Sequence, residues 1–277
     1  MSFWGKFKSL FKRKPAPTFK LGLALGSGGA KGYAELGALY CFEQNGIEFD
    51  IVAGTSIGSI IGAFYAAGYS STDCAELLKS VNASEIKNLF MINMDTLGLF
   101  KVIDRTIGNL DIEELKKPFR AVATELATGK EHVFKDGNVA KALCASSSYP
   151  PFFKPVIIDG VKYIDGAFAN SVPADLVKEM GADFIVGIDL SSRRKSGGGI
   201  LSHVFPEFKG GTEKPWQKGY DTADVMLSPN LTAYKSVSFS AAHEMFDLGY
   251  AEALKHMPEI KAKIAAAKLK KGIKDKR

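Results

Sequence analysis

A serine between small residues is the first feature of this sequence that points to covalent chemistry. Gly54-Thr55-Ser56-Ile57-Gly58 has the pattern G-x-S-x-G, in which a nucleophilic serine occupies a sharp turn between a strand and a helix. Such a turn is strained, so its neighbours two residues away must be small. An apolar run at 49–53 precedes the motif and a helical pattern at 56–67 follows it. This context predicts that Ser56 is a nucleophile, with a plain turn of small residues as the alternative.

A second glycine-rich stretch, Gly26-Ser27-Gly28-Gly29-Ala30-Lys31-Gly32, also lies between a strand pattern and a helix pattern. Glycines there leave backbone N–H groups free to bind an anion. In one interpretation Gly28 and Gly29 hold the oxyanion of a tetrahedral intermediate, where one donor contributes about 2.7–4 kcal/mol. In the other the stretch binds a dinucleotide, which requires an acid about 20 residues later at the end of the second strand. Glu48 and Asp50 have nearly that spacing but lie before or at the start of that strand.

A serine nucleophile needs a base, and two candidates differ in their setting. The chain has four histidines, none in a telling motif: His132, His203, His243 and His256. His243 lies in a predicted helix, 240–256, and is the alternative for a Ser-His-Asp triad. Asp165 ends a strand pattern and precedes Gly166-Ala167, and so small a turn would let the carboxylate reach Ser56 directly. An Asp-Gly pair is also a common turn.

The elements that must position these residues alternate between strand and helix patterns. Strands are expected at 19–25, 49–53, 119–124, 184–189 and 225–227, a hairpin at 156–164 with its turn at Asp159-Gly160, and helices at 30–45 and 56–67. Gly46 and Gly68 are expected to end the two helices. This alternation predicts an α/β fold in which helices cover both faces of a mostly parallel sheet.

Three stretches leave alternatives open. Residues 51–72 carry no charge and are long enough to span a bilayer, although a buried strand, turn and helix explain them as well. The strongly apolar run 90–103 is either core or a wall for an acyl chain. The irregular stretch 191–220 is either a mobile loop near the site or a surface insertion.

The net charge of +6 is concentrated at the two ends of the chain. Residues 1–20 carry six Lys/Arg and no acid, and residues 255–277 carry nine Lys/Arg and two acids, so the remainder has a net charge of −7. An acidic body with basic ends differs from a basic nucleic-acid-binding domain, so no nucleic-acid partner is expected. An anionic membrane surface is the partner that this distribution favours.

The first residues have the pattern of an interfacial amphipathic helix. Phe3, Phe7, Leu10 and Phe11 fall on one face, and Lys/Arg residues lie away from it. A helix docked on the protein's own core, or a frayed terminus, is the alternative. Pro15-Ala16-Pro17 then forms a stiff linker. The chain lacks the pattern of a secretory signal, and its three cysteines are widely spaced. We therefore expect a cytoplasmic protein, peripheral at the inner face of the membrane, while the sequence predicts no oligomeric state.

Four blocks in a fixed order resemble the patatin-like phospholipases in their bacterial form, over residues 19–190. The stretch from Gly26 to Gly32 is similar to the family's oxyanion block, and the one from Gly54 to Gly58 to its nucleophile elbow. Ala145-Ser146-Ser147-Ser148-Tyr149-Pro150-Pro151-Phe152-Phe153-Lys154-Pro155 is similar to the block before the catalytic aspartate. Asp165-Gly166-Ala167, followed by Asn170 and Pro173, is similar to the block that contains that aspartate.

The resemblance implies a three-layer α/β/α fold and a Ser56–Asp165 dyad that hydrolyses fatty-acyl esters of phospholipids or other lipids without a metal or cofactor. Ser27 stands where many members have glycine, so the oxyanion hole is assigned to Gly28 and Gly29. Ala167 replaces a second glycine, which is a common variant. We expect residues 1–18 to form the N-terminal segment and linker, 19–257 the catalytic domain and 258–277 a basic tail. The alternatives are a catalytically silent lipid-binding protein and a triad with His243.

Overall fold

A single mixed sheet organises the chain. The computed structural model describes residues 18–80, 96–191, 205–208 and 210–273. The sheet has eight strands in the order β5-β6-β3-β2-β1-β7-β8, with β4 also paired to β3. The strands are β1 (Leu21–Leu25), β2 (Ile51–Thr55), β3 (Phe119–Glu125), β4 (Glu131–Phe134), β5 (Val156–Ile158), β6 (Val161–Asp165), β7 (Phe184–Ile188) and β8 (Val225–Leu227). Along the row β3-β2-β1-β7-β8 each strand is parallel to its neighbours, whereas the pairs β3–β4, β3–β6 and β5–β6 are antiparallel. The predicted mostly parallel sheet is therefore confirmed.

The central strands read as continuous apolar runs because helices cover both of their faces. Every residue of β2 and β7 is buried, and β1 is buried from its second residue onward. Side chains alternate between the faces: Leu23 and Leu25 pack into one hydrophobic cluster, and Ala24 packs into another on the opposite side.

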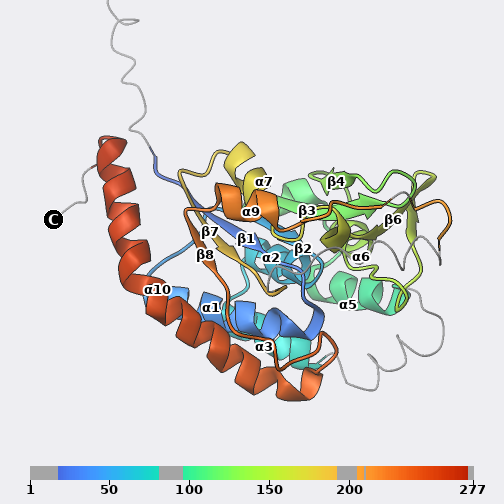
Figure 1. Ribbon diagram of the computed structural model, residues 1–277, viewed down its shortest axis with the longest axis horizontal. Coiled ribbons are helices and arrows are strands. Elements are labelled where there is room, and N and C mark those ends of the chain that lie inside the picture. The colour runs from blue at the N-terminus through green and yellow to red at the C-terminus, as the bar shows by residue number, and fades with distance from the viewer. Residues whose placement is uncertain (1–17, 81–95, 192–204, 209, 274–277) are drawn as a thin grey trace, which may run out of the picture.

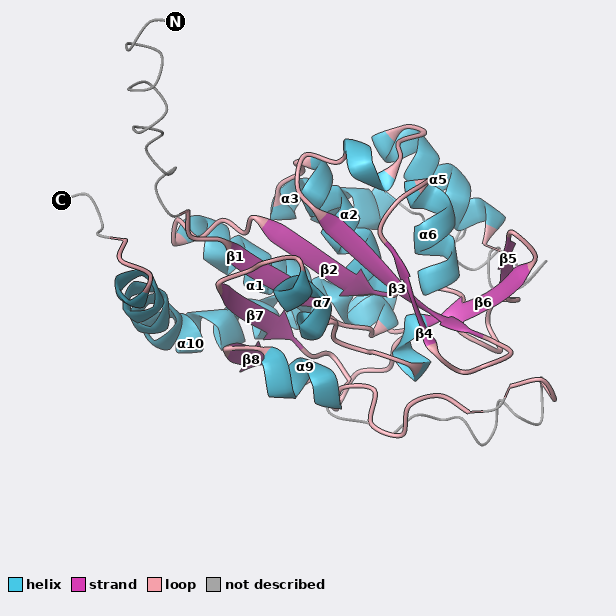
Figure 2. Ribbon diagram, turned by 90° about the horizontal axis from the view of Figure 1, so that it is seen from above, coloured by secondary structure: helices cyan, strands magenta, loops and turns pink. Residues whose placement is uncertain are grey.

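Two layers of helices enclose this sheet (Figure 1 and Figure 2). One layer contains α1 (Tyr33–Gln44), α2 (Ile57–Ala67), α3 (Ser71–Ser80), α5 (Leu97–Ile107), α6 (Val139–Ser146) and α10 (Ala242–Lys270). The other contains α7 (Ala174–Glu179) and α9 (Gln217–Thr222). Short 3-10 turns lie at Gly29–Gly32, Ile112–Glu114, Gly166–Phe168 and Phe239–Ala241. The expected arrangement of helices on both faces of the sheet is therefore confirmed.

The uncharged stretch 51–72 forms the buried strand, turn and helix that the sequence offered as one alternative. It forms β2, the turn at Ser56, α2 and the start of α3, and nearly all of α2 is buried against the sheet. Gly68 ends α2 with φ 98, the left-handed conformation expected at that position. In the part of the chain that the structure describes, no helix combines the length and the apolar character needed to cross a bilayer.

The last helix is longer than the sequence predicts. We expected a helix over 240–256, whereas α10 runs from Ala242 to Lys270 and contains Pro258 within it. Ile260 and Ile264 are buried, so the helix packs on the body beyond the proline. The expected end of the catalytic domain at residue 257 falls inside this helix. The N-terminal segment 1–17, with its predicted amphipathic helix, and residues 274–277 lie outside the described residues.

Two glycines allow α10 to lie directly on α1. A Cβ atom on Gly37 of α1 would collide with the backbone oxygen of Phe246, and one on Gly249 of α10 would collide with the backbone oxygen of Ala34. The backbones of α1 and α10 therefore approach more closely than any side chain would permit. This contact holds α10 against the rest of the protein.

Replacing Gly249 by alanine should force the two helices apart. Alanine raises the intrinsic helix propensity by about 1 kcal/mol, but the collision with a backbone atom outweighs this gain. We expect a net destabilisation of about 1–3 kcal/mol in urea unfolding. Ala251 is exposed on the same helix, and Ala251→Met is the matched control that should change stability little. A Gly249→Ala variant as stable as the wild type would contradict the close contact.

Candidate active site

Ser56 occupies a strained turn at the end of β2. Its φ of 57° and ψ of −125° are unusual for a residue with a side chain, and this backbone aims the side chain across the ends of the strands. A Cβ atom on Gly54 would collide with the backbone oxygen of Gly58, and one on Gly58 would lie 2.6 Å from the backbone oxygen of Gly26. The turn can therefore form only because both flanking residues lack side chains.

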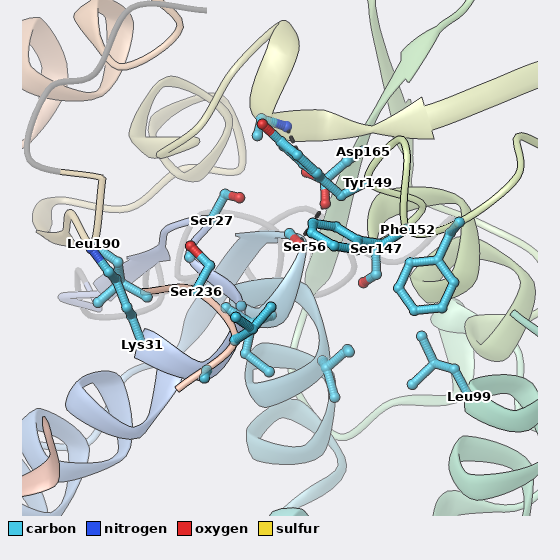
Figure 3. A pocket seen from close by; sticks show the side chains of 18 of the residues that line it. Ser27, Lys31, Ser56, Leu99, Ser147, Tyr149, Phe152, Asp165, Leu190 and Ser236 are labelled. Atoms are coloured by element: carbon cyan, nitrogen blue, oxygen red, sulfur yellow. Dashed lines mark hydrogen bonds between the residues drawn. The ribbon is translucent and has the colours of Figure 1, made fainter. Parts of the chain in front are cut away.

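Ser56 donates a hydrogen bond directly to a buried carboxylate. Its Oγ lies 2.6 Å from Oδ2 of Asp165 (Figure 3). The other carboxylate oxygen, Oδ1, accepts a hydrogen bond of 2.8 Å from the backbone N–H of Ala167. Asp165 is 0% exposed and Ser56 is 7% exposed. The pair is thus shielded from bulk water while the serine stays accessible from one side.

The sheet topology brings these two residues together although 109 positions separate them. Asp165 ends β6, which runs antiparallel to β3 and places Asp165 beside Ala123. The chain then crosses the end of β3 toward β2. It can do so because Gly166 has no side chain. A Cβ atom at this position would collide with the backbone oxygen of Val122. Beyond this crossing, the Thr55 hydroxyl donates to the backbone oxygen of Asn170, 2.8 Å away, and fastens the turn to β2.

Burial changes the acid–base character of Asp165. Desolvation raises the pKa of its carboxyl from the ordinary 3.8 to about 7, and the hydrogen bonds from Ser56 and from the N–H of Ala167 oppose this rise. A carboxylate with a pKa near neutrality is a far better proton acceptor than an exposed one. The Ser56–Asp165 pair can therefore exchange a proton at physiological pH.

The glycine-rich loop lies beside this pair and is anchored on both sides. The N–H of Ser27 donates to the backbone oxygen of Ser171, and that of Ala30 donates to the backbone oxygen of Ser236. Between these anchors, the N–H groups of Gly28 and Gly29 form no hydrogen bond to another described residue.

Each of these two glycines is also required by its surroundings. A Cβ atom on Gly28 would lie 2.7 Å from the Cβ atom of Leu190. Gly29 has φ +58° and fits directly under the backbone oxygen of Ser236. The loop thus offers two backbone donors in the same pocket as Ser56.

The end of the same loop packs on the helix of the nucleophile. Lys31 lies in the 3-10 turn Gly29–Gly32, is 2% exposed and lines the pocket. A Cβ atom on Gly32 would collide with the side chain of Ile57, so this glycine lets the turn rest on the first residue of α2. The glycine-rich loop and the serine turn are therefore held as one unit.

A buried acid that carries no assignment from the sequence supports this loop. Glu35 of α1 is 0% exposed, and its Oε1 accepts a hydrogen bond of 2.6 Å from the N–H of Gly26. Its Oε2 is buried without a hydrogen-bond partner among the described residues. Burial raises the pKa of the Glu35 carboxyl well above its ordinary value, and the nearby charge of Asp189 adds to the rise. Glu35 therefore keeps its proton to a higher pH than an exposed glutamate does.

An apolar cavity of about 390 Å³ opens above Ser56. Its walls come mainly from α2, α3, α5 and the segment before β5, and its apolar residues include Ile57, Ile60, Phe64, Leu77, Leu78, Leu99, Val102, Ile103, Phe152 and Phe153. The run 90–103, expected to be core or an acyl-chain wall, contributes Leu99, Val102 and Ile103 to the cavity, while its first part lies outside the described residues. Ser191 and Pro215, from the two ends of the irregular stretch 191–220, also line it.

None of the described histidines lines this cavity. The side chain of His243 is 91% exposed and lies 4.0 Å from Asp247 on its own helix. His132 packs against the rings of Phe134 and Tyr163, His256 lies beside Glu252, and His203 is outside the described residues. The alternative of a triad with His243 is therefore wrong in geometry, because its side chain points into solvent.

The dinucleotide alternative is also unsupported by the positions of its acids. Asp50 accepts a hydrogen bond from the N–H of Leu21 at the start of β1, and Glu48 pairs with Lys117. Both lie at the edge of the sheet opposite the glycine-rich loop. No group of three or more His, Cys, Asp or Glu side chains suited to a metal ion occurs in the described ranges.

Two contacts of the site escaped the sequence analysis. The Ser146 hydroxyl accepts a hydrogen bond of 2.9 Å from the N–H of Ser56, and Glu35 holds Gly26. Ser146 belongs to the serine-rich block that precedes Asp165, so a signal was present without a role. Glu35 carries no such signal, because its burial follows only from the packing of α1.

Replacing Glu35 by glutamine should alter how stability depends on pH. The folded protein keeps the Glu35 proton to a higher pH than the unfolded chain, which releases it near the ordinary value of 4.5. The wild type therefore loses stability as pH rises above 4.5. Glutamine keeps the acceptor for Gly26 and has no proton to lose, so the variant should gain on the wild type from pH 5 to pH 8 in urea unfolding.

The exposed Glu48→Gln change is the matched control and should leave the pH trend as it is. The measurement to compare is the change of stability with pH, and not the stability at one pH. The amide nitrogen of the glutamine also lacks a hydrogen-bond partner, which lowers the stability of the variant at every pH. Parallel curves of stability against pH for Glu35→Gln and wild type would contradict a raised pKa of Glu35.

Comparison with known proteins identifies the family of this chain. The sequence model described as "Patatin-like phospholipase" matches residues 23–178. Patatin-like phospholipase domain-containing protein 6 of Mus musculus is 28% identical over 272 residues, covering 83% of this chain and 20% of the mouse protein. An uncharacterised NTE family protein of Mycobacterium bovis is 32% identical over 178 residues, covering 62% of this chain and 49% of that protein. The chain thus matches about a fifth and about half of the lengths of these two relatives.

A solved structure shares the fold. VipD from Legionella pneumophila superposes with a TM-score of 0.56 at 14% identity, covering 88% of this chain and 68% of that one. At this identity the likeness concerns the fold alone. The family's sequence model matches more than half of the residues of this chain, so the chain belongs to the patatin-like phospholipase family.

Proposed function

We propose that this protein is a serine acyl hydrolase that cleaves fatty-acyl esters of lipids through Ser56 and Asp165. The observation that carries the proposal is the 2.6 Å hydrogen bond between these two buried side chains at an apolar cavity. Family membership supports lipid acyl hydrolysis as the class of reaction. The cavity's predominantly apolar wall fits a hydrocarbon chain better than a polar metabolite.

The reaction begins with transfer of the Ser56 proton to Asp165 as Ser56 Oγ attacks the ester carbonyl. The carbonyl oxygen becomes an oxyanion, which the N–H groups of Gly28 and Gly29 bind. The intermediate collapses, the bond to the alcohol breaks, and Asp165 returns its proton to the departing alcohol oxygen. An acyl-enzyme on Ser56 remains.

Water completes the cycle by the same steps in reverse order. Asp165 accepts a proton from the water molecule, which attacks the acyl-enzyme carbonyl, and the second oxyanion occupies the same two donors. Collapse releases the fatty acid, and the proton on Asp165 returns to Ser56 Oγ. One carboxylate thus serves as base and acid in both halves.

Labelling with a fluorophosphonate probe tests the proposal. Wild type should label and should turn over a p-nitrophenyl ester. Ser56→Ala should abolish labelling, and Asp165→Asn should lower turnover by at least about 10³-fold, because residues of such a unit fail together. His243→Ala is the control and should retain full activity. A wild type that neither labels nor turns over ester, with and without lipid vesicles, would favour a catalytically silent lipid-binding protein.

The pH dependence of kcat/KM should report Asp165. Its carboxyl must be ionised to accept the Ser56 proton, and its pKa is raised to about 7. Activity on a soluble ester should therefore fall as pH drops through about 7, by about tenfold per pH unit once well below it. A profile that stays flat from pH 5.5 to pH 8 would show that another group sets the rate.

A further inference from the structure

Exposed apolar side chains gather around the entrance of the cavity. Tyr149, Phe152 and Val237 line it and are 40%, 43% and 48% exposed. Leu97 begins α5, two residues before the cavity-lining Leu99, and is 62% exposed. Figure 3 shows Tyr149, Phe152 and Leu99 on the same side of Ser56. Single exposed apolar residues are ordinary, whereas a group around one opening marks an interaction surface.

Exposed lysines accompany these apolar residues. Lys101 follows Leu97 by one helical turn, Lys154 follows Phe152 by two residues, and Lys235 precedes Val237 by two. All three are exposed, and none forms an ion pair with an acid in the described ranges. Among the described residues that line the cavity, the only acid is the buried Asp165. The entrance therefore combines apolar and cationic groups, which suits an anionic lipid surface.

We propose that this entrance, defined by Leu97, Tyr149, Phe152 and Val237 with the three lysines Lys101, Lys154 and Lys235, is the face with which the protein docks on an anionic lipid bilayer. The inference rests on the proposed function for its purpose: a docked entrance lets an acyl chain pass from the bilayer to Ser56 without crossing water. The apolar side chains enter the interface, and the ammonium groups lie at the level of the lipid head groups.

The orientation differs from that expected of the N-terminal segment alone. The described chain enters at Thr18, just before β1, whereas Ser56 lies beyond the end of β2, which is parallel to β1. Thr18 therefore lies at the edge of the sheet opposite the cavity, so the entrance is a different face of the described body from the one at which that body begins.

Charge reversal at the entrance tests the docking face in the full-length protein. The variant Lys101→Glu/Lys154→Glu/Lys235→Glu should weaken binding to phosphatidylglycerol/phosphatidylcholine vesicles by at least about tenfold in a sedimentation assay, since each lysine near such a surface contributes several-fold. The matched control is Lys135→Glu/Lys141→Glu/Lys178→Glu, which makes the same change in net charge. These three lysines are exposed and lie toward the opposite edge of the sheet, at the end of β4, the start of α6 and the end of α7. The control should keep binding within about threefold of wild type.

An apolar pair completes the design. Leu97→Ser should also weaken vesicle binding, whereas Leu269→Ser, at a leucine 68% exposed near the end of α10, should not. Equal binding by the two charge variants, or by the two leucine variants, would overturn the proposal. So would a change of oligomeric state by Leu97→Ser in light scattering with vesicle binding intact, because the face would then bind a second copy.

Soluble-ester turnover separates this proposal from the proposed function. The substituted lysines and leucines do not line the cavity, so all four variants should turn over a soluble p-nitrophenyl ester like the wild type and melt at a similar temperature. An inactive wild type that still binds vesicles through the entrance would refute the proposed function and leave the docking face in place. An active wild type whose binding ignores the entrance would do the opposite.

Discussion

The hydrogen bond between Ser56 and Asp165 is the interaction around which the rest of the structure is arranged. A carboxylate separated from water is unfavourable unless it is hydrogen-bonded, and Asp165 receives a side-chain bond from Ser56 and a backbone bond from Ala167. The serine in turn occupies a backbone conformation that residues with side chains seldom adopt. Strain and burial at one point require support from the surrounding elements.

That support depends largely on glycines, which have no Cβ atom. Gly54, Gly58 and Gly166 each stand where a Cβ atom would meet the backbone of a neighbouring element. Together they let the ends of β1, β2 and β3 and the chain after β6 converge above one serine. The glycines of the motifs therefore mark positions where two backbones approach closely. This explains why sequence motifs predict a contact between Ser56 and Asp165, which are 109 positions apart.

Local patterns gave much of the fold and part of the site. The hairpin with Asp159 and Gly160 at its turn is found with φ 50° and 80°, as the required left-handed conformations dictate. The strand 225–227 was predicted to the residue. Helix α10 was underestimated because Pro258 favours a helix end, whereas burial of Ile260 and Ile264 against the body sustains the helix past it. Tertiary contacts of this kind cannot be predicted from a short stretch of neighbouring residues.

The site shows the same limit. Ser56 and Asp165 carry motif signals, but the environment of Glu35 does not follow from its neighbours in sequence. A glutamate in a helix is usually solvated, and only the packing of α1 beneath the end of β1 reveals that this one is buried and holds Gly26. The raised pKa of Glu35 is a property of the assembled layers.

An aspartate at its ordinary pKa is too weak a base to help a serine at neutral pH, since it is fully ionised and hardly accepts a proton. Burial removes this limitation here by raising the pKa of Asp165 to about 7, close to the range in which histidine normally works. In the proposed reaction the fold must therefore exclude water from Asp165 and still admit substrate to Ser56. The structure has the features for both, because Asp165 is fully buried and Ser56 lines an apolar cavity.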